Sequence, residues 1–129
     1  MKVGLVDAVR LLDQSQLGLS GAKRLEELFH NQQRELAPLI AQAQKAKRPA
    51  ENQKLEEKAR EQEQAREKLR GDLRDALLAK ARTIIAKLAP AAGMDFVMAQ
   101  PQVLLWASPE LDLTDKVLAA LDAEAKAQV

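Results

Sequence analysis

The chain has 129 residues, which is enough for one ordinary domain but not comfortably for two. Only 2% of its residues are aromatic, and this scarcity speaks against the large core of an α/β enzyme. The chain has no cysteine, which excludes disulfides, zinc–thiolate sites and thiol catalysis. Its formal net charge is +1, but the middle of the chain is mildly basic and the two ends together are acidic.

Strand and helix signals alternate at the start of the chain. The run Lys2–Val6 is rich in β-branched residues and predicts a short strand. Asp7 follows it and predicts the N-cap of a brief helix. Glycines 18 and 21 then predict a looser stretch before the next helix.

Two long helices, residues 22–47 and 50–89, are predicted for the middle of the chain. Apolar residues recur there at spacings of three and four, which is the pattern of one buried helical face. Pro49 interrupts the pattern and is well placed in the first turn of the second helix. Two helices of similar length around one break predict an antiparallel hairpin, an arm of residues 22–89 with its tip near 47–50.

The pattern changes from helical to alternating after Gly93, which we expect to be the left-handed cap of the second long helix. Two more strands, Asp95–Ala99 and Val103–Ala107, are predicted, separated by a turn at Pro101. Thr114 then predicts the cap of a final helix whose inner face is apolar. The fold class is therefore α+β and mostly helical, with residues 1–21 and 90–129 forming a small β-core.

Three short strands and two small helices cannot cover both faces and both edges of such a sheet. We therefore expect copies of the chain to complete the β-core by self-association. The residues expected in this oligomer core are apolar and lie in or beside the predicted strands: Val3, Leu5, Phe96, Val97, Leu104 and Trp106.

Both ends of the chain resemble the Skp (OmpH-like) family of periplasmic chaperones. The opening run from Lys2 to Leu12 carries one part of this resemblance. The closing part comprises residues 93–98, 103–109 and 111–118, with the Gly93-Met94-Asp95 entry to a strand and the Asp112-Leu113-Thr114 cap as its most specific pieces. The order and spacing of these pieces agree with the family over nearly the whole chain.

The resemblance implies a homotrimer in which three helical arms extend from a common body and surround a cavity. Such chaperones hold unfolded outer-membrane proteins in the cavity without ATP, so unfolded outer-membrane proteins are the expected partners. The resemblance also implies a periplasmic location. From the sequence itself, Met1 to Val6 do not form a secretory signal, which fits either a cytoplasmic protein or a mature chain with an added initiator methionine.

The side chains expected to bind such clients lie on the hairpin. Four are apolar and three are basic: Leu36, Leu39, Ile40 and Leu55, with Lys54, Lys58 and Arg66. The apolar four fit either the hairpin core or the lining of a cavity. The basic three fit either a solvated helix face or the attraction of acidic client segments and anionic lipid head groups.

Chemistry beyond binding finds little support in the sequence. His30 is the single histidine, and no further donors at matched spacing predict a metal site around it. Without a glycine-rich phosphate loop or a nucleophile elbow, neither a cofactor nor enzymatic activity is expected. Acidic residues interleave the basic ones, so nucleic acid is not an expected partner. The alternative to a chaperone is a coiled-coil adaptor that docks one specific folded partner.

Overall fold

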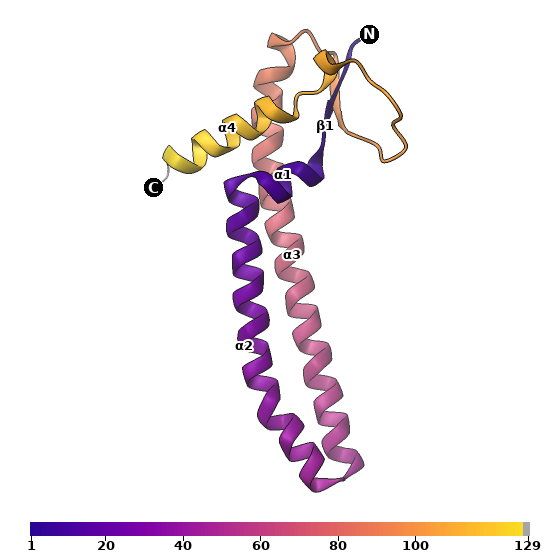
Figure 1. The fold of residues 1–129 in the computed structure, drawn as a ribbon, viewed down its shortest axis with the longest axis vertical. Helices are drawn as coiled ribbons and strands as arrows, with labels where there is room; N and C mark the ends of the chain where they lie inside the picture. The colour runs from indigo at the N-terminus through magenta and orange to yellow at the C-terminus, as the bar shows by residue number, and fades with distance from the viewer. Residues whose placement is uncertain (128–129) are drawn as a thin grey trace. The chain divides into compact units, whose positions relative to one another are not determined.

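The computed structural model describes residues 1–127, which are mostly helical (Figure 1). The elements in chain order are β1 (Val3–Val6), α1 (Ala8–Gln14), α2 (Gln16–Ala46), α3 (Pro49–Ala91), β2 (Phe96–Ala99), the 3-10 turn η1 (Pro109–Leu111) and α4 (Thr114–Ala127). They form two compact units: a first unit of Met1–Ser20 with Leu73–Val129, and a second unit of Gly21–Asp72. The predicted fold class, with a long helical hairpin and a small sheet, is confirmed.

The sheet of the first unit has two strands, β1 and β2, which run parallel with Val3 opposite Phe96. On its other side, β1 accepts a hydrogen bond of 2.9 Å from the Leu113 N–H to the Leu5 carbonyl. β1 is therefore held on both sides. The second edge of β2 pairs with no strand among residues 1–127.

The predicted strand Val103–Ala107 is wrong, because the structure has a loop there that joins β2 to η1. The Leu104 N–H donates to the Pro101 carbonyl at 3.1 Å, which closes a turn. A strand exists only where another strand accepts and donates its backbone hydrogen bonds. Within the described part of one chain, no segment does so for residues 103–107.

The core of the first unit brings together side chains from both ends of the chain and from α3. Its buried apolar members are Val6, Leu11, Leu77, Ala81, Ile84, Met94, Leu113, Val117 and Leu121. The inner face predicted for α4 is confirmed, since Val117 and Leu121 are fully buried and Leu118 packs against them. Residues more than 100 positions apart in the sequence therefore share one apolar cluster.

The junction of α1 and α2 corrects the looser stretch expected around residues 18 and 21, because α2 already begins at Gln16. Asp7 caps α1 as predicted, its carboxylate accepting the Arg10 N–H at 3.2 Å. Ser15 then separates the two helices, and its hydroxyl accepts the Gly18 N–H at 3.0 Å. A Cβ on Gly18 would lie 1.8 Å from the Leu12 carbonyl oxygen, so the glycine allows the two helices to approach closely.

The second unit is an antiparallel helical hairpin made of the parts of α2 and α3 within residues 21–72 (Figure 1). Lys47, between the two helices, has a left-handed backbone with φ 51°. Pro49 is the first residue of α3, as predicted. At the far end of α3, in the first unit, Gly93 has φ 75° and the Met94 N–H donates to the Ala89 carbonyl at 2.9 Å. This pattern is the glycine cap expected from the sequence.

Candidate functional site

The seam of the hairpin contains a buried polar contact where most helical hairpins have apolar residues. The Gln32 side-chain amide donates to the Gln62 backbone carbonyl at 2.9 Å. The Gln62 side-chain amide donates in return to the Gln32 carbonyl, also at 2.9 Å. Arg66 donates to the Gln32 side-chain oxygen at 2.8 Å, and its guanidinium lies 5.6 Å from the centre of the Phe29 ring. We call Phe29, Gln32, Gln62 and Arg66 the glutamine clasp.

Replacing Gln32 with alanine should destabilise the hairpin by about 1–3 kcal/mol, because it removes the amide that donates to the Gln62 carbonyl and the side-chain oxygen that accepts from Arg66. Gln33 is the matched control, since it is the same residue type one position along α2 and is exposed. Gln33→Ala should change the free energy of unfolding by less than about 0.5 kcal/mol. Urea unfolding followed by circular dichroism measures both variants, and equal midpoints would contradict a stabilising clasp.

The apolar residues predicted to bind clients lie along this hairpin. Leu36, Leu39 and Leu55 are half-buried, while Ile40 is exposed. The half-buried positions contribute to the seam and still present part of their apolar surface to solvent. The alternatives of core and cavity lining are therefore not exclusive for these side chains.

The basic residues predicted to bind clients differ in how they are engaged. Lys58 pairs with Glu35 across the hairpin at 3.5 Å, and Lys54 lies 4.0 Å from Glu51. Arg66 belongs to the glutamine clasp, so its guanidinium is already hydrogen-bonded within the chain. Exposed pairs such as those of the two lysines contribute little to stability. The lysine ammonium groups can therefore exchange these partners for others at small cost.

The residues predicted for the oligomer core all lie in the first unit, but they differ in exposure. Leu5 is buried between β2 and Asp112, and Val3, Val97 and Leu104 are half-buried. Phe96 is 45% exposed and Trp106 is 79% exposed. The structure thus pairs β1 with β2, and it leaves the Trp106 side chain in solvent.

Two further apolar residues of the β2–η1 loop are more exposed than those the sequence singled out. Val103 is 84% exposed and Leu105 is 99% exposed. In the sequence they belong to the unbroken apolar run from Val103 to Trp106, a pattern that is unusual for a surface loop. A monomeric protein rarely presents such a run to water, so this loop is a candidate interaction surface.

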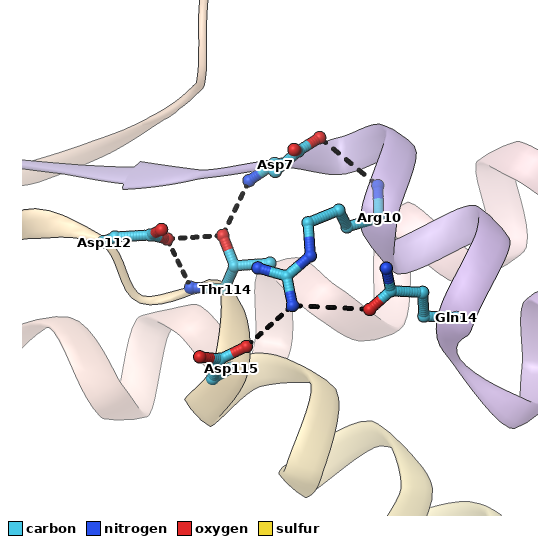
Figure 2. A network of polar contacts seen from close by, with 6 residues as sticks. All are labelled: Asp7, Arg10, Gln14, Asp112, Thr114 and Asp115. Carbon is cyan, nitrogen blue, oxygen red and sulfur yellow. Dashed lines mark hydrogen bonds and ion pairs between the residues drawn. The ribbon is translucent and has the colours of Figure 1, made fainter. Parts of the chain in front are cut away.

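A polar network fastens the N-terminal segment to α4 within the first unit, as Figure 2 shows. The Thr114 hydroxyl accepts the Asp7 N–H at 2.9 Å and donates to Asp112. Asp112 also accepts the Thr114 N–H at 2.9 Å, while Arg10 pairs with Asp115 at 2.8 Å. The predicted cap is therefore corrected: Asp112 caps α4, and the Thr114 hydroxyl instead joins Asp112 to the backbone that leaves β1.

Neither a metal-ligand cluster nor a membrane-spanning helix is found among residues 1–127. His30 is exposed and lies 3.6 Å from Glu26, and no three His, Cys, Asp or Glu side chains gather as ligands within residues 1–127. None of the helices in this range is long and apolar enough to cross a bilayer. The surfaces that remain are the hairpin and the apolar loop, and both are suited to binding other polypeptides.

Comparison with known proteins places the chain in a family. The OmpH family, described as outer membrane protein (OmpH-like), matches residues 2–121, from the start of β1 into α4. No curated protein sequence matches the chain. Members of this family are periplasmic chaperones and are not enzymes. Because the match covers most of its length, the chain belongs to the OmpH-like (Skp) family.

Proposed function

We propose that the chain is an ATP-independent holdase that binds unfolded outer-membrane proteins in a cavity between the helical arms of a homotrimer. The observation that carries this proposal is family membership over residues 2–121 together with the exposed apolar side chains of Val103, Leu105 and Trp106. The family supplies the chaperone role, and these side chains supply a surface for self-association. In this proposal residues 1–21 and 90–129 form the trimer body and residues 22–89 form the arm.

The hairpin supports binding of many different clients. The buried positions of its seam include Gln32, Ala43 and Gln62 but no leucine, and Leu36, Leu39, Leu55 and Ile40 leave apolar surface accessible. Each such contact is weak, and no single pocket selects one client sequence. Three arms acting together would supply the holding strength through multivalency.

The test is the dilution of an unfolded outer-membrane β-barrel protein from urea into buffer with an equimolar amount of trimer. The proposal predicts that turbidity stays near the baseline without ATP. Ile40→Ser should lower this protection, whereas Val9→Ser, an exposed apolar residue of the first unit, should not. Aggregation at the rate of the client alone would contradict the proposal, and capture of one folded partner would support the adaptor.

We also propose contact between the hairpin turn and anionic membrane surfaces. Lys45, Lys47 and Arg48 are exposed around the turn, and each basic residue near such a surface contributes about 1 kcal/mol. Cosedimentation should therefore occur with anionic vesicles at low salt and fall with added salt. Equal cosedimentation with zwitterionic vesicles would contradict an electrostatic contact.

A further inference from the structure

An apolar pocket of about 240 Å³ lies in the first unit, between β2, α1 and α3. Leu78 and Ile85 of α3, Leu11 of α1 and the β2 residues 97–99 line it. Arg82 adds a charged group to this otherwise apolar lining. None of the loop residues 100–108 of the same chain lines the pocket. The chain thus has an unfilled apolar pocket and, separately, an unburied apolar loop.

The loop offers side chains of the kind that such a pocket accommodates. In Figure 1 it is the orange segment that extends away from the strand pair. Trp106 is 79% exposed, and burial of a tryptophan typically removes 150–250 Å² of surface from water. Burying Trp106 against another surface therefore favours association, because this side chain is not buried within one copy of the chain.

Charge complementarity favours a second copy of this chain as the partner. Arg82 pairs with no carboxylate among residues 1–127. Glu110 follows Trp106 by four residues and is exposed. Among residues 1–127 its carboxylate forms no ion pair and accepts one hydrogen bond, from the Ser108 hydroxyl at 3.4 Å. A loop whose tryptophan enters the pocket can therefore bring a carboxylate toward the cation of the pocket. Opposite charges placed in this way steer association and fix its register.

We propose that Trp106 of one copy inserts into the pocket formed by Leu11, Leu78 and Ile85 of a second copy, with Glu110 facing Arg82. This inference rests on the self-association proposed above and names the contact that produces it. It also assigns the exposed loop to assembly, which leaves the hairpin as the surface for clients. The loop and the pocket belong to every copy, so each copy can both give and receive a tryptophan.

The test uses the single tryptophan of the chain as its own reporter. Trp106 is the only tryptophan, and the chain has no tyrosine, so all tryptophan emission comes from the loop. Emission and acrylamide quenching are recorded over a concentration series, with molar mass measured by light scattering on the same samples. As mass rises above the 14.2 kDa of one chain, emission should shift to shorter wavelength and quenching should fall at least about twofold.

Two sets of variants locate the contact. Ala99 is exposed and lines the pocket, so Ala99→Leu should fill the pocket and return the emission to that of a solvated tryptophan. Ala123→Leu is the control, since Ala123 is exposed on α4 and outside the pocket. Arg82→Glu should weaken association roughly two- to fivefold, and adding Glu110→Arg should restore it.

The outcomes distinguish the insertion of Trp106 into the pocket from self-association of the chain in general. An oligomer whose tryptophan emits as in water would overturn the insertion and leave self-association intact. A blue-shifted emission that Ala99→Leu does not change would place Trp106 in another site and overturn the pocket assignment. A monomer at every concentration would overturn both the insertion and the trimer.

Discussion

Replacing Gly18 with alanine is expected to destabilise the first unit by at least about 3 kcal/mol. The added Cβ would lie 1.8 Å from the Leu12 carbonyl oxygen and 2.6 Å from its carbon. Both atoms belong to the backbone of α1, so no side-chain rotation relieves the clash. The two helices must move apart, and this movement disturbs the buried Leu11 beside them.

Gly71 provides the matched control for this prediction. It lies inside α3, and a Cβ placed there meets nothing within 4 Å. Gly71→Ala should therefore raise the free energy of unfolding by about 0.5–1 kcal/mol, because alanine loses less conformational entropy in a helix than glycine. Urea unfolding at one fixed protein concentration measures both variants. If Gly18→Ala unfolded at the same midpoint as the unmodified chain, the close approach of α1 and α2 would be wrong.

The second large effect is expected from Leu104→Asp, which should disperse the oligomer. Leu104 is half-buried, lines a pocket together with Leu5 in one chain, and lies in the proposed self-association loop. An unpaired carboxylate buried in an interface costs several kcal/mol, which corresponds to a loss of affinity of about 100-fold or more. Light scattering at equal concentration measures the loss of mass, and circular dichroism checks that helicity persists.

Gln102→Asp is the matched control for this variant, because Gln102 lies in the same loop and is exposed. It adds the same charge at a position that carries no apolar surface into the interface, so the molar mass should not change. If Leu104→Asp also kept the full molar mass, Leu104 would lie outside the interface. The assignment of the loop to assembly would then need to rest on Trp106 alone.

Local signals predicted the fold well wherever a few neighbouring residues decide the conformation. Asp7 caps α1, Pro49 begins α3 and Gly93 adopts the left-handed cap, since each depends on its own backbone and the nearest turn. The inner face of α4 followed from its helical spacing for the same reason. These features require no knowledge of the rest of the chain.

Features that depend on distant partners could not be predicted in this way. The run Val103–Ala107 has the residues of a strand, but strand formation needs a neighbour, and one chain supplies none for it. Glycines near residue 18 are typical of loops, and only the packing of two helices reveals Gly18 as a close contact. Propensity was overridden in both cases by tertiary structure.

The glutamine clasp shows the same limit in the candidate site. Gln32 and Gln62 follow the helical spacing of the buried face, so the sequence places each of them on the seam. Their reciprocal hydrogen bonds depend on the register between two helices, 30 residues apart along the chain. The engagement of Arg66 with Gln32 is likewise invisible in the sequence.

The molar mass of the unmodified chain in solution tests the central claim most directly, because the account holds that one copy leaves its apolar loop unsatisfied. Light scattering at micromolar concentration should give three times the 14.2 kDa of a single chain. A well-folded species with the mass of one chain, with Val103, Leu105 and Trp106 still in water, would contradict the account.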